Sequence, residues 1–333
     1  MSNGMVDRIS VTRRQVLGWG AIVAGGLLVR HASGEGNDLP PQLQYRFVNN
    51  TGGKWKDEEC FWSLNNGRQW HSFDKDSTVP CPRSAGRLYL CVGSPPKDFD
   101  DRNAYWDFIE FACHSGTWYG NTTQVDGFCI PLTVSLGEKV IGITKSRGAM
   151  FETFPADCPK EFRDCVKGDF WIIAPIKAGF DKDGPHKDYF DAYVDEVWAM
   201  YETEKLTPGG KYTGKVEEGS LIFTAVGGGK TYKCSKKPST QDILLGSGVL
   251  GPNPQFCAAF NRHVAADPGD WNNPKKFYQA EPCNWYSKFF HDYSINGKAY
   301  GFCYDDVADQ AAFFGAKGNE VVVTLNWSKE AKK

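Results

Sequence analysis

The sequence lacks an excess of charge of either sign. Lys and Arg together number 38 and Asp and Glu together number 40, so the net charge is only −2 at pH 7. Proteins that bind nucleic acid usually carry a basic surface that attracts phosphate groups. The composition therefore predicts no nucleic-acid partner, and a nearly neutral chain suits an uncharged ligand.

Closely spaced cysteine pairs are lacking as well. The chain has 11 cysteines but no Cys-x-x-Cys motif, and this spacing argues against a zinc site. In an exported protein, disulfides are the better interpretation, with at least one thiol left over because the number is odd. Proximity along the chain suggests three bonds, Cys158–Cys165, Cys81–Cys91 and Cys257–Cys283.

Long apolar runs are missing, apart from one near the N-terminus. There, Arg13 and Arg14 precede an apolar run from Val16 to Val29, and small residues follow at 32–34. This order is typical of an export signal; the paired arginines favour the twin-arginine type, although a general secretory signal fits nearly as well. The run is too short and too rich in glycine for a membrane span. We expect residues 1–38 to be an export signal and short linker, and the mature protein to be secreted without stable membrane insertion.

Complete motifs for several common chemistries are absent. The stretch AVGGGKT ends like a phosphate loop, but that motif requires Gly where the chain has Thr224. The stretch DKDGPHKDYFD lacks the glycine and the terminal Glu of a calcium loop, and there is no Gly-x-Ser-x-Gly elbow. The acidic group Asp305, Asp306 and Asp309 fits a solvated loop or turn better than a cation site. No metal or organic cofactor is expected.

A regular pattern of strands and helices is present instead. From about 42 to 132, short extended runs such as GRLYLCVG are broken by Gly, Pro and Asn, which predicts an antiparallel β-sandwich or barrel. Apolar residues at three- and four-residue spacing from Phe190 to Tyr201 predict an amphipathic helix, and another is expected near 255–264. We predict a mainly β protein with an α/β part: a β domain of residues 39–175 and 291–333, and a mixed α/β domain of residues 176–290.

Two acids lie within strand-like segments of the stretch WDFIEFACHSGTWYGNTTQVDGFCIPL, which runs from residue 106 to 132. A hairpin that turns near Trp118 would place Glu110 roughly opposite Asp126, and period-two alternation would put both on one face. Asp107 falls on the other face and is predicted to be an ordinary surface acid.

This pairing supports two hypotheses. Exposed acid pairs are common, yet like charges directly opposite each other destabilise a strand pair, so a purely structural protein has little use for them. A glycosidase does have a use, because one carboxylic acid protonates the leaving oxygen while a second carboxylate activates water or attacks. Direct cross-strand pairing of the two acids would favour a retaining enzyme. A bulge or long loop would increase the distance between the two carboxyl groups toward the ~6.5–9.5 Å of inverting enzymes.

The same stretch resembles a known family. The string DFIEFA…NTTQVDGFCIPL is similar to the signature of glycoside hydrolase family 64, the laminaripentaose-producing, thaumatin-like β-1,3-glucanases. Further similar segments follow in the family's order: YFDAYVDEVWAMY, LLGSGVLGP, CAAFNRHV and KAYGFCYDDV. The resemblance implies a thaumatin-like β-barrel or sandwich with an added α/β domain, together forming a wide groove. It also implies hydrolysis with inversion, with Glu110 as general acid and Asp126 as general base.

The resemblance bears on neighbouring residues too. The best candidates for binding the sugar, unless the aromatic rings simply pack on the loop, are Trp118, Tyr119, Asn121 and Thr123. The family usually has Gly where this chain has Cys129. A Cys113–Cys129 disulfide could brace the hairpin; alternatively, either cysteine is a free buried thiol.

These observations predict a secreted, monomeric endo-β-1,3-glucanase that acts on long β-1,3-glucan chains and releases short laminari-oligosaccharides. The alternative is a non-catalytic thaumatin-like protein that binds glucan or a cell wall, with the acids lining a polar groove. Retention of both acids favours the enzyme, whereas the cysteine content keeps the alternative open. A buried ion pair at either acid would favour the binding protein.

Overall fold

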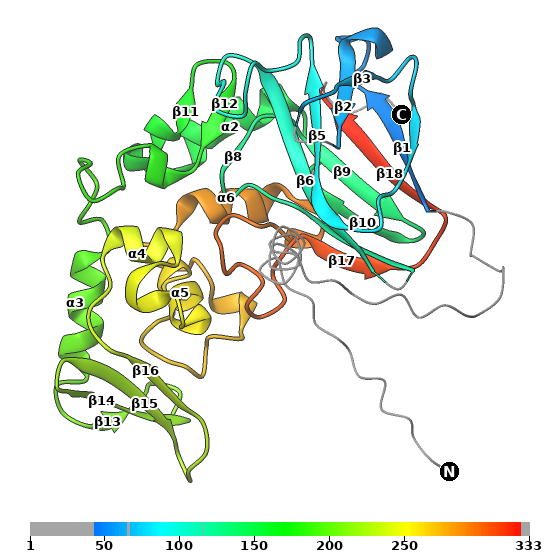
Figure 1. Ribbon diagram of the computed structural model, residues 1–333. Coiled ribbons are helices and arrows are strands. Elements are labelled where there is room, and N and C mark those ends of the chain that lie inside the picture. The colour runs from blue at the N-terminus through cyan, green and yellow to red at the C-terminus, as the bar shows by residue number, and fades with distance from the viewer. Residues whose placement is uncertain (1–42, 65–66, 115, 328–333) are drawn as a thin grey trace, which may run out of the picture.

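A computed structural model describes residues 43–64, 67–114 and 116–327 (Figure 1). The predicted export signal, residues 1–38, lies outside the described residues. Within the described part, no helix combines the length and the apolar character that a membrane span requires.

Two large β-sheets form one of the two halves of the molecule in space (Figure 1). One has the order β10-β9-β18-β1-β4, with strands Lys139–Gly142, Leu132–Leu136, Glu320–Asn326, Gln44–Asn50 and Thr78–Pro80. The other has the order β17-β7-β6-β5-β2-β3, with strands Phe313–Ala316, Thr117–Thr122, Tyr105–His114, Ala85–Val92, Cys60–Ser63 and His71–Ser72. Neither sheet closes on itself within the described residues, so the structure is a sandwich and the barrel alternative is wrong.

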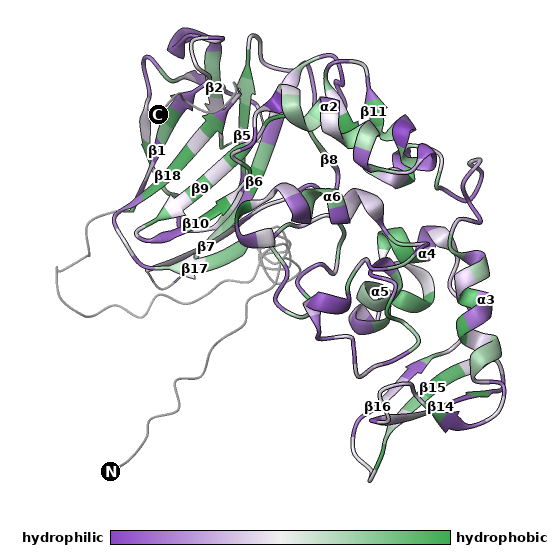
Figure 2. Cartoon of the chain, turned by 180° about the vertical axis from the view of Figure 1, so that it is seen from behind, coloured by the Kyte–Doolittle hydropathy of each residue, from purple (hydrophilic) through white to green (hydrophobic). Residues whose placement is uncertain are grey.

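Aromatic side chains fill the space between these two sheets. Tyr45 and Phe47 alternate along β1 toward the core, and their rings meet Phe111 of β6 at 5.7 Å and Trp62 of β2 at 5.1 Å. Figure 2 shows hydrophobic segments recurring along the strands of both sheets, with hydrophilic residues mainly in the connections. Much of the high aromatic content therefore belongs to the core rather than to a binding surface.

The end of the chain returns to the centre of the sandwich. Strand β18 lies between β1, to which it is parallel, and β9, to which it is antiparallel. Strand β17 adds an edge to the other sheet by pairing with β7. Residues near 320 are therefore required to complete the core around the N-terminal strands.

A small three-stranded sheet joins the sandwich to the rest of the molecule. Its strands are β8 (Gly127–Phe128), β12 (Trp171–Ile173) and β11 (Val166–Lys167). Helix α2 (Arg147–Asp157) lies beside this sheet (Figure 1). Ser146 caps α2 by accepting a hydrogen bond from the Ala149 N–H group.

The second half of the molecule is helical with a peripheral meander (Figure 1). Its helices are α3 (Asp191–Met200), α4 (Thr240–Leu245), α5 (Pro254–Asn261) and α6 (Trp285–Tyr293). The meander contains β13 (Lys205–Leu206), β14 (Tyr212–Glu217), β15 (Ser220–Ala225) and β16 (Thr231–Cys234). Short 3₁₀ helices lie at Asp57–Glu59, Lys160–Cys165, Pro175–Lys177, Gly248–Leu250, Pro274–Lys276 and Ile295–Gly297. The helices predicted at 190–201 and near 255–264 are confirmed, and AVGGGKT forms the β15–β16 hairpin turn.

The predicted disulfides are not formed. All eleven cysteines lie among the described residues, and every one is a free thiol, so the four suggested pairings are wrong. Most are buried, and burial raises the pKa of the Cys60 and Cys283 thiols to about 12. A buried, protonated cysteine packs as a small hydrophobic residue, which is the role these side chains have here.

A buried ionic cluster holds the C-terminal loop against the helices. Asp305, predicted within a solvated loop or turn, has no exposed surface. Its carboxylate accepts hydrogen bonds from Arg262 Nη2 at 3.0 Å and from Ser287 Oγ at 2.9 Å, and it lies 3.1 Å from His291 Nε2. The loop that leads into β17 is thereby fastened to α5 and α6.

Asp305→Asn should destabilise the protein by about 3–5 kcal/mol, because it leaves the buried Arg262 guanidinium without its counter-charge. The measurement is urea unfolding of the full chain. The matched control is Asp309→Asn, since the Asp309 side chain is fully exposed; it should change stability by less than about 0.5 kcal/mol. Equal effects of the two substitutions would contradict this role for Asp305.

Stability should also depend on Asp305 at acid pH. Burial by itself raises the pKa of Asp305, but His291 and Arg262 outweigh burial and hold it at about 2. An aspartate is protonated near pH 4 in an unfolded chain, so the contribution of ionised Asp305 is present above about pH 4 and is lost as the pH falls toward 2. Urea unfolding at several pH values should therefore show a steeper acid loss for the unmodified protein than for Asp305→Asn. Parallel curves would refute the assignment.

Candidate active site

Glu110 lies in the middle of β6, between two strands that supply its partners. The strand register sets Arg87 of β5 on one side of it and Asn121 of β7 on the other. Arg87 donates to Glu110 Oε1 from Nη2 at 3.1 Å and from Nε at 3.3 Å, and Asn121 Nδ2 donates to Oε2 at 3.3 Å. Glu110 itself is completely buried, so its carboxylate meets protein groups on both oxygens.

Asp126 is not opposite Glu110 across the hairpin, as the sequence had suggested. Strand β6 ends at His114 and β7 begins at Thr117, so the chain reverses before Trp118 and Glu110 pairs with Asn121. Asp126 follows β7 in a turn that is closed by the Gly127 N–H group donating to the Gln124 carbonyl at 3.1 Å. Its side chain is 46% exposed.

The two acids nevertheless meet, because both approach one guanidinium. Arg87 Nη2 lies 3.1 Å from Glu110 Oε1 and 3.8 Å from Asp126 Oδ2. These two oxygens cannot be farther apart than the two distances added together, about 7 Å. The bound includes the ~5–5.5 Å of retaining glycosidases and the lower end of the ~6.5–9.5 Å range of inverting ones. A cation between the acids also offsets the repulsion that their closeness would cause.

Arg87 is the site residue that sequence reasoning missed. Its guanidinium lies 4.3 Å from the centroid of the Phe108 ring, which shares a strand face with Glu110. The side chain is 32% exposed, so Arg87 covers Glu110 and presents part of itself to solvent. The segment GRLYLCVG contains a single charge in an otherwise apolar strand, and that was the available signal.

The turn that carries Asp126 is held by distant parts of the chain. The Gln124 N–H group donates to the Tyr300 carbonyl at 2.9 Å, and the Tyr286 hydroxyl donates to the Gln124 carbonyl at 2.5 Å. Gly127 has a positive φ of 149°, and a Cβ atom there would lie 3.2 Å from Trp171. Both the left-handed backbone and the close ring favour glycine at this position.

Asp107 is buried, contrary to the prediction of a surface acid. It is 4% exposed, and its Oδ2 accepts hydrogen bonds from the N–H groups of Cys129 at 3.0 Å and Ile130 at 3.2 Å. Its Oδ1 accepts from the Phe108 N–H group at 2.8 Å. The alternation along β6 does point Asp107 away from Glu110, but that face is covered by the segment after Asp126.

The four predicted sugar-binding residues have different surroundings. Trp118 is completely buried and donates from Nε1 to the Tyr45 hydroxyl at 3.0 Å, which leaves no ring face open to a sugar. Tyr119 is partly exposed and stacks on Phe313 at 6.4 Å. Asn121 is buried against Glu110, and the buried Thr123 Oγ1 accepts from the Val125 N–H group at 3.3 Å beside Asp126.

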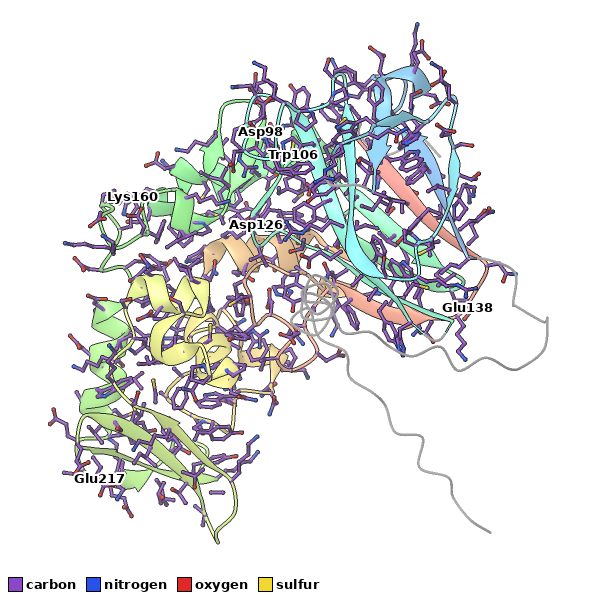
Figure 3. The ribbon with its side chains drawn as sticks, in the orientation of Figure 1. Asp98, Trp106, Asp126, Glu138, Lys160 and Glu217 are labelled. Atoms are coloured by element: carbon purple, nitrogen blue, oxygen red, sulfur yellow. The ribbon has the colours of Figure 1, made fainter. Side chains whose placement is uncertain are left out.

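A small cavity of about 110 Å³ lies beside Asp126. Its lining comes from the segment Ala174–Lys177, the end of α4 and the loop near Cys303, so it lies where the sandwich meets the helical half. Figure 3 shows Asp126 at this junction, next to α6. Asp126 is therefore exposed toward both halves of the molecule.

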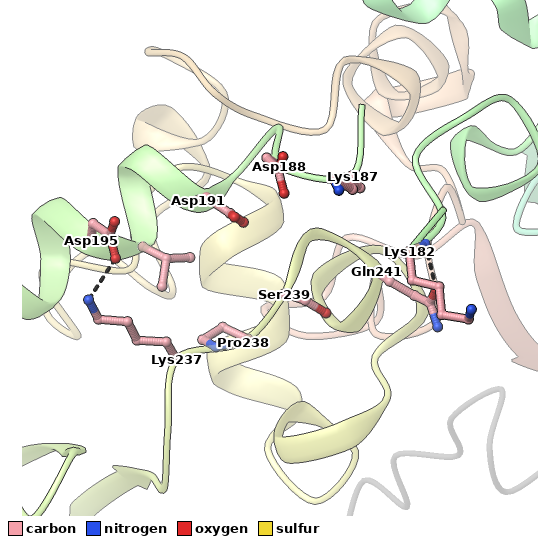
Figure 4. A pocket seen from close by; sticks show the side chains of 10 residues that line it. Lys182, Lys187, Asp188, Asp191, Asp195, Lys237, Pro238, Ser239 and Gln241 are labelled. Atoms are coloured by element: carbon pink, nitrogen blue, oxygen red, sulfur yellow. Dashed lines mark hydrogen bonds and ion pairs between the residues drawn. The ribbon is translucent and has the colours of Figure 1, made fainter. Parts of the chain in front are cut away.

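A larger hollow of about 390 Å³ lies between α3 and α4 (Figure 4). Its lining is charged and contains no aromatic ring, and Lys237 pairs with Asp195 at 2.6 Å. A glucan site needs apolar faces for sugar rings as well as polar groups, so this hollow does not suit that ligand. Among the described residues, no group of three or more His, Cys, Asp or Glu side chains is arranged to hold a metal ion.

Comparisons with known proteins identify the family of this chain. A family model described as Beta-1,3-glucanase, for glycoside hydrolase family 64, matches residues 63–324. A glucan endo-1,3-beta-glucosidase of Cellulosimicrobium cellulans is 26% identical over 280 residues, which is 69% of this chain and 50% of that protein. The chain thus spans about half the length of the curated relatives it matches.

Solved structures show the same fold. A beta-1,3-glucanase domain of family 64 from Clostridium beijerinckii is 25% identical, with a TM-score of 0.74, covering 87% of this chain and all of that one. A laminaripentaose-producing beta-1,3-glucanase from Paenibacillus barengoltzii, complexed with laminarihexaose, is 27% identical with a TM-score of 0.68, covering 86% of this chain and 76% of that one. The match to the family model over most of the sequence shows that this chain belongs to the beta-1,3-glucanases of glycoside hydrolase family 64.

Proposed function

We propose that this protein is a secreted, monomeric endo-β-1,3-glucanase that cuts long β-1,3-glucan chains and releases short laminari-oligosaccharides. The observation that carries the proposal is the meeting of Glu110 and Asp126 at one guanidinium, although they come from separate structural elements. Family membership and the activities of the relatives support the substrate class. Export is supported by the pattern of residues 1–38 alone.

In the proposed reaction, Glu110 is the general acid and Asp126 the general base. Once Arg87 has moved aside and Glu110 has taken up a proton from solvent, Glu110 gives that proton to the glycosidic oxygen as the bond to the anomeric carbon breaks. Asp126 takes a proton from a water molecule that attacks that carbon from the opposite face, which inverts its configuration. The 46% exposure of Asp126 suits contact with water, and the bound of about 7 Å on the oxygen separation admits an inverting arrangement.

Arg87 must change partners during this reaction. It covers the buried Glu110 in the described structure, so a glycosidic oxygen can reach Glu110 only after the guanidinium moves aside. Asp126, the second anion within reach, lies 3.8 Å from the same nitrogen and can retain the positive charge near the site. In this proposal the sandwich is the thaumatin-like domain, and the helical half is the added α/β domain that completes a wide groove.

A glucan- or wall-binding protein without catalysis is the second candidate. One observation favours it: Glu110 is completely buried in an ion pair with Arg87. Such an ion pair can line a polar groove without any catalytic role. However, the Arg87 guanidinium in this ion pair also lies beside Asp126, so a long side chain connects a buried acid with an exposed one. Hydrolysis assays separate the two functions directly.

Glu110→Gln and Asp126→Asn should each lower the hydrolysis of a linear β-1,3-glucan by at least about 10³-fold, because each removes a proton-transfer group. The assay compares both variants with the unmodified protein and sizes the products. NMR of the first product formed should show the α-anomer. Release of the β-anomer would disprove inversion.

Glu138→Gln is the matched control for this experiment, because Glu138 is an exposed acid in the β9–β10 turn (Figure 3). It should keep full activity. All variants should keep their unfolding transitions and their retention on insoluble glucan. If the unmodified protein binds glucan but releases no sugar, the binding-protein alternative is correct.

Arg87→Met should lower stability by about 1–3 kcal/mol, because it leaves the buried Glu110 without its cation. The double variant Arg87→Met/Glu110→Gln removes both charges and should recover most of that stability, although it should be inactive because glutamine cannot give a proton. Urea unfolding of the two single variants and the double variant gives the coupling between the charges. Strictly additive losses of stability would show that the ion pair contributes nothing.

A further inference from the structure

The segment after Asp126 is fixed at its far end by a side chain from the strand that carries Glu110. Asp107 lies three residues before Glu110 on β6, and it binds the N–H groups of Cys129 and Ile130. These groups come three and four residues after Asp126. Asp107 thus forms a direct link between the two chain segments that supply the proposed acid and base.

The near end of the segment continues from β7, which pairs with β6 as far as Ile109↔Thr122, and it is also held by parts of the chain beyond the sandwich. Tyr286 and Tyr300 hold Gln124, as described above, and β8 pairs with β12 through Ile172↔Phe128 and Ile173↔Gly127. These contacts belong to the helical half and to the small sheet. Asp107 adds a contact between this segment and the strand of Glu110 on the far side of Asp126, where β7 no longer pairs with β6.

Burying the Asp107 carboxyl group is energetically unfavourable, which argues that Asp107 has a specific role at this position. Burial raises the pKa of Asp107 to about 7, while the N–H groups of Cys129 and Ile130 and the charge of Arg102 act to lower it. Desolvating a carboxyl group is unfavourable unless its hydrogen bonds are replaced, and three backbone N–H groups replace them here. The Arg147 guanidinium binds the Cys129 carbonyl at 2.8 Å, so the same peptide is held from the other side.

We propose that Asp107 is a positioning residue, which fixes the distance between Asp126 and Glu110 by holding the backbone at Cys129 and Ile130. The inference rests on the proposed hydrolase function and adds a residue to its site. Misplacing a reacting group by about 1 Å can cost about 10²-fold in rate. Loss of the link should therefore lower kcat more than it weakens glucan binding.

The test uses Asp107→Ala and Asp107→Asn in the full chain. Alanine removes both acceptors, whereas asparagine can keep one oxygen toward Cys129 and Ile130 and sets its NH₂ group against the Phe108 N–H. We expect kcat on linear β-1,3-glucan to fall about 10- to 100-fold for alanine and less for asparagine, with KM within about threefold. Hydrogen exchange of the peptide that contains residues 126–130 should accelerate in the same order. If the alanine variant does not fold, the asparagine variant alone carries the test.

Two comparisons separate positioning from general damage to the fold. Asp98→Asn is the matched control, because Asp98 is an exposed acid that accepts a backbone N–H group, from Asp100 at 2.9 Å; it should change neither kcat nor the exchange of 126–130. Adding Asp107→Ala to Asp126→Asn should cost no further activity, because Asp107 acts only through Asp126.

Each outcome decides the proposal. Unchanged exchange at 126–130 in both Asp107 variants would overturn it regardless of activity. Faster exchange with unchanged kcat would also overturn it, provided that Asp126→Asn is inactive. An unmodified protein that does not hydrolyse glucan would show that the proposed function had failed; faster exchange would then leave Asp107 as a structural contact without a catalytic role.

Discussion

The candidate site depends on one interaction, the contact of the Arg87 guanidinium with both Glu110 and Asp126. Two carboxylates within about 7 Å repel each other, and one of them is completely buried. A cation between them makes the arrangement tolerable, because it lowers the cost of desolvating Glu110. The register of β5 on β6 places Arg87 beside Glu110, so the site exists only when the central strands of the sheet pair correctly.

The remainder of the fold serves to bring Asp126 to that guanidinium. Its turn is not part of the β6–β7 hairpin, and it would be unconstrained if the hairpin were the whole structure. Tyr300 and Tyr286, from the end of the chain, hold its beginning, and Asp107 holds its end. Asp305 in turn fastens the loop near Tyr300 to α5 and α6 through Arg262 and Ser287. Residues from four parts of the sequence thus converge on the position of one carboxylate.

Cysteine and aromatic content had been the least informative features of the composition. The thiols are free and mostly buried, and they pack in the core as small apolar side chains do. Trp118, which looked like a sugar platform, instead closes the core by bonding to Tyr45. In both instances the residue type was compatible with surface or core, and only the tertiary packing decided between them.

The sequence by itself determined the strand pattern, the helix at 190–201, the family, and the two acids of the candidate site. These features depend on local periodicity and on residues a short distance apart, which the chain order preserves. Tertiary structure alone decided that Glu110 faces Asn121 rather than Asp126, that Arg87 joins the acids, and that Asp107 is buried. Each of these depends on the register of a strand or on contacts between segments far apart in the sequence, and a one-residue slip in register reverses which face a side chain occupies.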